Sequence, residues 1–137
     1  MMSPPYTFLA VDRGFRVFGR GKDYVRYLTE GVVTSDSKIK QKRSSLIRFL
    51  RGWNKSVNYY RANPGLMVAY IQKRFAIKDG RLAERMYEED AANRTENGEI
   101  DDTAMAEILE TAKETMKVKT SIPANQLFDF SLVKETK

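Results

Sequence analysis

The sequence predicts an α/β chain in which two short strands come first and four or five helices follow. Two segments rich in β-branched and aromatic residues, 15–18 and 31–35, are predicted as the strands. From about residue 44 onward, apolar residues recur every three or four positions, which is the spacing of one helical face. Because two isolated strands form no stable sheet, both strands need partners from elsewhere.

The N-terminal elements are delimited by proline and glycine. The turn Ser3-Pro4-Pro5 is expected to begin a short helix, since proline suits the first helical turn, and Gly14 is expected to end it. The strand 15–18 stops at Gly19-Arg20-Gly21, whose glycines permit a sharp reversal of the chain. The second strand, 31–35, leads into the first long helix.

The longest predicted helix runs from about Ser44 to Ala62, with Ser44 or Ser45 as its cap, and Ser35 or Asp36 is a further candidate for a helix cap. Its apolar residues fall on one stripe that is expected to be buried: Leu46, Phe49, Leu50, Trp53, Val57 and Tyr60.

Three polar residues mark the starts of further helices. Asn63 precedes Pro64, Asp79 precedes Gly80, and Asp101 precedes an apolar pattern. The residues expected to face inward from the first two of these helices are Met67, Tyr70, Ile71, Phe75, Leu82, Met86 and Tyr87.

The composition excludes most catalytic chemistry. The 137-residue chain is 42% hydrophobic, which suits one folded core, and it contains no Cys and no His. There is therefore no thiolate nucleophile, no imidazole base and no Cys or His ligand for a metal. We expect a protein that is no enzyme and that holds no metal and no cofactor.

The net charge of +6 is unevenly distributed. Residues 1–75 carry 15 Lys and Arg against 4 Asp and Glu, whereas residues 76–137 carry 9 against 14. The basic run Lys38, Lys40, Lys42, Arg43, with Arg48, Arg51 and Lys55 after it, is a candidate for binding nucleic acid. A solvated helix face explains the same run, because Arg48, Arg51 and Lys55 lie opposite the apolar stripe and no aromatic residues interleave with them for base stacking.

Two other polar motifs have structural explanations. The loop Gly19–Lys22 lacks the spacing of a phosphate-binding loop. Exposed helix ends account for the acidic residues Glu88-Glu89-Asp90 and Asp101-Asp102. The turn Ser3-Pro4-Pro5-Tyr6 differs, because a hydroxyl, two rigid prolines and an aromatic ring suit a turn that faces a ligand.

The order of the segments is similar to that of a known family. They are Ser3-Pro4-Pro5-Tyr6-Thr7-Phe8-Leu9-Ala10, Arg13-Gly14-Phe15-Arg16-Val17, Gly19-Arg20-Gly21-Lys22-Asp23-Tyr24-Val25-Arg26-Tyr27, Gly31-Val32-Val33-Thr34, the long helix, and the closing residues 122–131. Together they resemble the carboxyl-terminal part of the SsuA/THI5-like substrate-binding proteins of ABC transporters, over essentially the whole chain.

The resemblance implies a fold and a domain organisation. The fold is the helix-rich carboxyl-terminal portion of a type II periplasmic binding protein, in which two lobes close on a ligand. Residues 1–28 would end the second lobe, residues 29–35 would form the strand that crosses the hinge, and residues 36–137 would be the helical closing part of the first lobe. Most of both lobes would then precede residue 1.

The same resemblance implies a solute-binding component of an ABC importer, here a fragment or truncated homologue that binds a small organic solute by lobe closure. The family's ligands include sulfonates, nitrate-like anions and pyrimidine precursors of thiamine. The implied ligand-binding residues are Ser3, Pro5 and Tyr6 at the turn, and Thr29 and Gly31 beside the hinge.

The implied partners are the ligand and the transporter permease, and the open strand edges favour a homodimer or a strand-swapped assembly. The family is periplasmic, although no signal peptide stands at the start of this sequence, and we expect no membrane insertion. On this interpretation the protein binds no nucleic acid. The alternative is a small helical nucleic-acid-binding or regulatory protein that uses the basic half.

Overall fold

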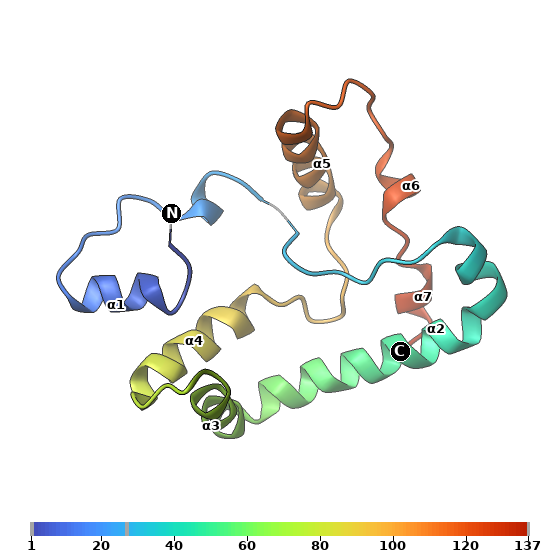
Figure 1. Cartoon of the computed structure of the whole chain (residues 1–137). Coiled ribbons are helices and arrows are strands. Elements are labelled where there is room, and N and C mark those ends of the chain that lie inside the picture. Colours follow the sequence, from blue (N-terminus) through green and yellow to red (C-terminus); the bar gives the residue numbers. More distant parts are fainter. Residues whose placement is uncertain (1, 27, 137) are drawn as a thin grey trace. The chain divides into compact units, whose positions relative to one another are not determined.

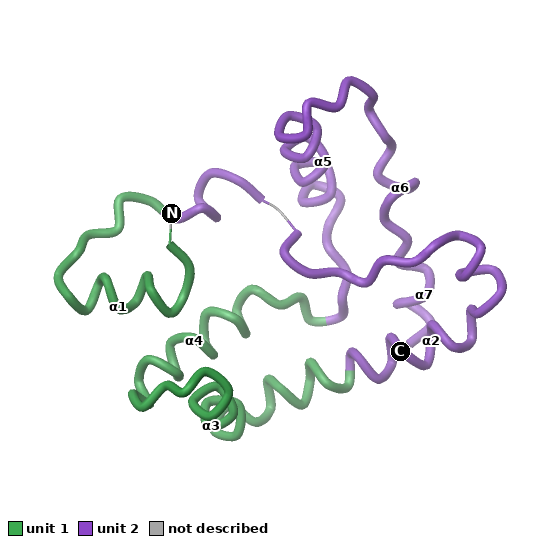
Figure 2. The backbone as a smooth tube through the Cα atoms, viewed as in Figure 1, with its two compact units in different colours: residues 1–19, 55–96 green, residues 20–54, 97–137 purple. Residues whose placement is uncertain are grey.

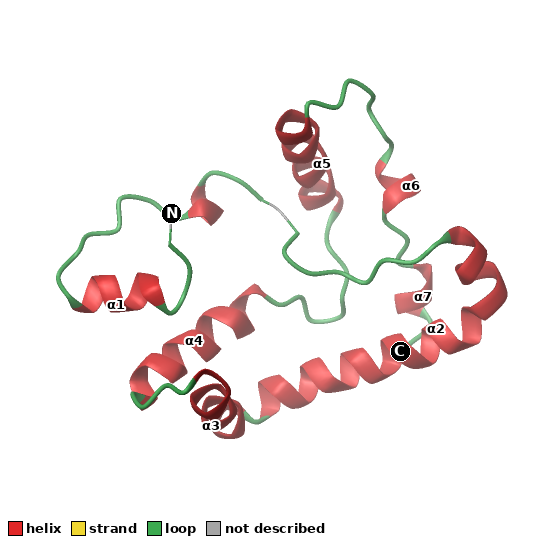
Figure 3. Ribbon diagram, in the orientation of Figure 1, coloured by secondary structure: helices red, strands yellow, loops and turns green. Residues whose placement is uncertain are grey.

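The computed structural model describes residues 2–26 and 28–136, and in this part of the chain all regular structure is helical (Figure 1). In chain order the elements are α1 (Tyr6–Asp12), the 3₁₀ helix η1 (Gly21–Asp23), α2 (Asp36–Ala62), α3 (Pro64–Phe75), α4 (Gly80–Asn93), α5 (Asp102–Met116), α6 (Ala124–Leu127) and α7 (Ser131–Lys134). The described residues contain no strand (Figure 3). The predicted α/β class is therefore wrong, and so is the portion of a type II periplasmic binding protein fold, which requires those strands.

The two segments predicted as strands have irregular structure because they have nothing to pair with. Among the described residues, no backbone hydrogen bond involves Arg16–Gly19 or Gly31–Thr34. The side chains of Phe18 and Val33 are almost fully exposed, at 102% and 94%. A ladder of hydrogen bonds to a neighbouring strand is what makes a segment of high β-propensity into a strand, and that ladder is missing here.

The described chain divides into two compact units (Figure 2). Unit 1 comprises residues 1–19 and 55–96, and unit 2 comprises residues 20–54 and 97–137. Helix α2 contributes residues 55–62 to unit 1 and residues 36–54 to unit 2. The predicted lobe boundaries concern a larger protein and stay predictions.

Most of the predicted helix starts are confirmed, and side-chain caps explain them. The Asp79 carboxylate accepts hydrogen bonds from the backbone N–H groups of Arg81 (2.9 Å) and Leu82 (3.4 Å). The Asp101 carboxylate accepts one from Ala104 (2.7 Å). Each bond satisfies an N–H group that the first helical turn leaves without a partner.

Helix α2 begins earlier than Ser44. The Ser35 hydroxyl accepts a hydrogen bond from the Lys38 N–H group (3.4 Å), as expected of a cap, and the helix starts at Asp36. The helix is kinked at Lys42, whose backbone angles of φ −126° and ψ 24° are not helical.

The core of unit 1 lies between α3 and α4, which pack on each other (Figure 1). Its buried residues are Ile71, Ala83 and Tyr87, and Ala83 has no exposed surface. Leu82 is also buried and Met86 partly so, as the helical spacing predicts.

Several residues expected to be buried are exposed instead. Phe49 and Trp53 on α2 are about half exposed, as are Tyr70 and Phe75 on α3. The spacing of apolar residues determines which of them share a helix face, but another element must cover that face before they are buried.

The buried residues of unit 2 are Leu132 and Val133 on α7 and Ala104 on α5. The residues that follow α7 are tied to α2: Arg43 pairs with Glu135, and the Asn54 amide donates a hydrogen bond to the Thr136 hydroxyl (3.0 Å). None of the helices in the described part of the chain combines the length and apolar character needed to span a bilayer.

Candidate functional site

A hollow of about 590 Å³ lies between α3 and α4 and is formed entirely by residues of these two helices. We call it the α3–α4 hollow. Ligand pockets in proteins commonly measure about 300–1,000 Å³, so its size suits a small organic molecule. It lies within unit 1 and does not depend on the placement of unit 2.

The sequence builds this hollow through the turn that joins the two helices. Ala76 ends α3 in the left-handed conformation, with φ 53°. The Gln72 side-chain amide then donates a hydrogen bond to the Lys78 carbonyl oxygen (3.4 Å), and Asp79 caps α4. These local bonds reverse the chain so that α3 and α4 pack on each other and the hollow forms between them.

The apolar part of the lining includes Val68, Ala69 and Tyr87. The Tyr87 hydroxyl donates to the backbone carbonyl oxygens of Tyr60 and Arg61, each at 3.3 Å. Because the hydroxyl is bonded to these two carbonyl groups, the part of Tyr87 that is available to the hollow is its aromatic ring. Gly65 also lines the hollow, and a Cβ atom at this position would meet nothing within 4 Å.

The polar part of the lining consists of Gln72, Arg81, Glu84 and Glu88. Glu84 and Glu88 are exposed, and within the described residues neither carboxylate makes an ion pair or a hydrogen bond. They are four residues apart on α4, so two like charges stand on neighbouring turns and repel each other.

Asp90, by contrast, is engaged in the structure of unit 1. Its carboxylate accepts hydrogen bonds from the Arg94 guanidinium at 2.8 and 3.2 Å. Burial, and then the hydrogen bond to Asp90, raise the pKa of the Tyr60 hydroxyl above its ordinary value. Asp90 is therefore a structural residue, whereas Glu84 and Glu88 are available to a ligand.

The first three predicted ligand residues lie at the start of α1 in unit 1. The carbonyl oxygens of Ser3 and Pro5 accept the first hydrogen bonds of the helix, and Tyr6 is exposed. Helix α1 is held to α4 by Arg85, which contacts the Asp12 carboxylate at 2.7 and 2.9 Å. The Arg85 guanidinium also lies 4.4 Å from the centre of the Phe8 ring.

The other two predicted ligand residues, Thr29 and Gly31, are exposed residues of unit 2 outside any helix. None of the five predicted residues, Ser3, Pro5, Tyr6, Thr29 and Gly31, lines the α3–α4 hollow. Their assignment to ligand binding stays a prediction.

The sequence reasoning missed most of the residues of the hollow. The signal was present as two pairs at helical spacing: Gly65 and Ala69 on α3, and Glu84 and Glu88 on α4. Small residues on one helix and unpaired carboxylates on the next can form a hollow, but only the packing of the two helices shows that they meet.

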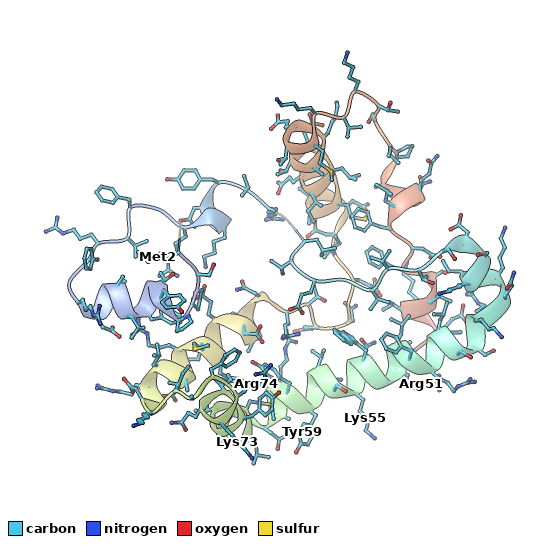
Figure 4. The ribbon with its side chains drawn as sticks, in the orientation of Figure 1. Met2, Arg51, Lys55, Tyr59, Lys73 and Arg74 are labelled. Atoms are coloured by element: carbon cyan, nitrogen blue, oxygen red, sulfur yellow. The ribbon has the colours of Figure 1, made fainter. Side chains whose placement is uncertain are left out.

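The basic run lies on α2. Lys40–Ser45 line a second hollow of about 210 Å³ at the kink, where Arg43 already pairs with Glu135. Farther along the helix, in unit 1, Lys55 and Tyr59 project from one side of α2 (Figure 4). The exposed Tyr59 lies one turn after Lys55, so an aromatic ring does accompany the cations. This changes the interpretation of the basic run as only a solvated helix face.

The structure does not support two other polar motifs as binding sites, the Gly19–Lys22 loop and the acidic residues. In the Gly19–Lys22 loop, the Arg20 N–H group donates to the Asp23 carboxylate (3.2 Å), so the loop already binds an anion of its own chain. Among the described residues, no group of three or more acidic side chains is placed to hold a metal ion.

Comparison with known proteins identified no relative of the chain. No family model matches the chain, and neither the curated proteins nor the solved structures include a significant match.

Proposed function

We propose that this chain is a non-enzymatic solute-binding component of an ABC importer and that it captures a small organic solute. The observation that carries the proposal is the α3–α4 hollow, which has a ligand's size, an apolar lining and a few polar groups. The resemblance of the segment order to the SsuA/THI5-like proteins supplies the transport context. Neither the hollow nor the resemblance requires a catalytic residue.

In this proposal the ring of Tyr87 and the side chains of Val68 and Ala69 bind the apolar body of the solute. The polar groups of Gln72, Arg81, Glu84 and Glu88 replace part of its hydration and orient it. The loaded protein then delivers the solute to the permease. We expect the capture and delivery of the solute to take place outside the cytoplasm, as in the family that the chain resembles.

Calorimetric titration tests the proposal. The full chain is titrated with a panel of sulfonates, nitrate and substituted pyrimidines, and we expect saturable binding of at least one. Ala69→Leu should weaken that binding, because the larger side chain takes up part of the hollow. Ala92→Leu, an equally conservative change at an exposed position of the same unit, should leave it unchanged.

A second variant, Tyr6→Ala, tests whether the solute binds at the predicted turn or in the α3–α4 hollow. Tyr6 is exposed, so its removal has little structural cost. If Tyr6→Ala abolishes binding and Ala69→Leu leaves it unchanged, the ligand lies at the predicted turn and not in the hollow. If a folded, ligand-free preparation binds no member of this panel and none of the organic probes described in the next subsection, the proposed function is wrong.

A second candidate function, binding of single-stranded nucleic acid, has one observation in its favour. Lys55 and Tyr59 project from one side of α2, and neither makes an ion pair among the described residues. Cations that bind phosphates and a ring on which a base can stack are the two parts of such a surface.

Salt dependence decides this second candidate. Fluorescence anisotropy with labelled oligonucleotides should give binding that weakens steeply between low and physiological salt, since phosphate contacts release counterions. Lys55→Gln should flatten the dependence on salt, and Tyr59→Ala should lower affinity at every salt concentration. The absence of binding at low salt would exclude the candidate.

A further inference from the structure

The charge of the α3–α4 hollow distinguishes between classes of solute. Its ionisable lining residues are the carboxylates of Glu84 and Glu88 and one cation, Arg81. No ion pair joins Arg81 to either carboxylate in the described structure. The hollow therefore has a net negative charge, although the chain as a whole is positive.

We infer that the α3–α4 hollow binds an ammonium-bearing solute with an apolar body, whose positive group lies between the Glu84 and Glu88 carboxylates. The inference rests on the proposed function, because it names the class of solute that the hollow accepts. It departs from the sulfonates and nitrate-like anions that are among the ligands of the family that the chain resembles.

Three features of the lining fit this class. The two carboxylates stand one turn apart on α4, so one cation between them relieves their repulsion and contacts both. Tyr87 lies between them in sequence and lines the same hollow, where its ring favours a cation as well as an apolar group. Val68 and Ala69 complete the apolar lining from α3.

The alternative explanation is that the two carboxylates are solvated surface charges. The surroundings of Glu89, on the same helix, provide the comparison. Glu89 does not line the hollow, so it is a carboxylate of α4 that lies outside the proposed site. Removal of its charge gives a control for nonspecific electrostatic effects.

The test uses three probes with a similar apolar body and different charge: 2-phenylethylamine, 2-phenylethanol and 3-phenylpropionate. Each is titrated into the full chain and followed by backbone amide NMR. We expect 2-phenylethylamine to bind, with shifts concentrated on α3 and α4, and 3-phenylpropionate to bind more weakly by about fivefold or more.

Variants that replace Glu by the isosteric Gln show which carboxylates contribute to binding of the ammonium group. The double variant Glu84→Gln/Glu88→Gln should weaken binding of 2-phenylethylamine by about fivefold and leave binding of 2-phenylethanol unchanged. Glu89→Gln should behave as the wild type. Circular dichroism verifies that each variant keeps its helical content.

The outcomes separate the two proposals. If 3-phenylpropionate binds as well as or better than the amine, the solute class is overturned and the solute-binding function stands. If the double variant binds the amine as tightly as the wild type, the position between Glu84 and Glu88 is wrong. If no probe saturates and no member of the calorimetric panel binds, the hollow is no solute site and the proposed function fails with it.

Discussion

At the scale of the residue, single side chains that bind backbone N–H groups determine where helices begin. Asp79 and Asp101 each accept such a bond at a helix start, and both were predicted from sequence. Asn63 is different, because its amide donates to the Tyr59 carbonyl oxygen (2.8 Å) and makes no cap. There the fixed φ of Pro64 at the first helical position defines the start of α3.

The cap at Asp79 gives a first prediction. Asp79→Ala should lower the free energy of unfolding by about 1 kcal/mol, because the N–H groups of Arg81 and Leu82 lose their acceptor. Urea denaturation followed by circular dichroism measures the change. Asp79→Asn is the control, since an amide oxygen still caps the helix; an equal loss in both variants would contradict the capping role.

A second prediction concerns pH and Asp129. The Ser131 hydroxyl and N–H group donate to the Asp129 carboxylate, and together with the charge of Arg43 they lower its pKa below the usual 3.8. A pKa that is lower in the folded than in the unfolded state stabilises the fold above the unfolded value. This contribution is lost as the pH falls through the folded pKa.

Asp129→Asn should therefore destabilise the protein slightly at neutral pH, and the difference from wild type should vanish in strongly acidic solution. The effect is small because Asp129 is exposed to solvent. Unfolding by urea at a series of pH values measures it. A difference that does not change with pH would show that the charge of Asp129 has no part in it.

At the scale of the element, the pair α3–α4 is the best-packed part of unit 1. Ala83 is fully buried against Ile71 and Tyr87 in its core. The helical spacing of Leu82, Met86 and Tyr87 predicted the inward face of α4 correctly. The same reasoning was wrong for Tyr70 and Phe75 of α3, because no described element covers the face on which they lie.

Substitution of Ala83 gives a third prediction. Ala83→Leu should destabilise the protein by about 1–3 kcal/mol, because the added atoms must displace packed neighbours. The exposed Ala92→Leu should change stability by less than about 0.5 kcal/mol. Both are measured by urea denaturation, and similar values for the two would show that α3 and α4 are not packed as described.

At the scale of the whole molecule, much apolar surface is left uncovered. Among the exposed large apolar residues are Phe15, Phe18 and Val33, in the segments that were predicted as strands, and Tyr24 between these segments. The backbone N–H and C=O groups of residues 16–19 and 31–34 also lack backbone partners within the described chain. Exposed apolar side chains next to unpaired backbone favour association.

The fourth prediction follows from that surface. Light scattering should give a mass above the 15.8 kDa of one chain, rising with concentration. Phe18→Ser should reduce the association, because it removes the most exposed ring, and Arg13→Ser at a nearby exposed position should not. A strict monomer at all concentrations would refute the predicted self-association.

Features that depend on neighbours a few residues away could be predicted from the sequence. The starts of α4 and α5, the proline at the start of α3 and the inward face of α4 follow from capping and helical spacing, which are local. The folded chain was needed to show which helix faces are covered and that the segments 15–18 and 31–35 are not strands. Only the packing of α3 on α4 brought Ala69 to the same hollow as Glu84 and Glu88. These features depend on segments distant in sequence, and the spacing within one segment carries no information about them.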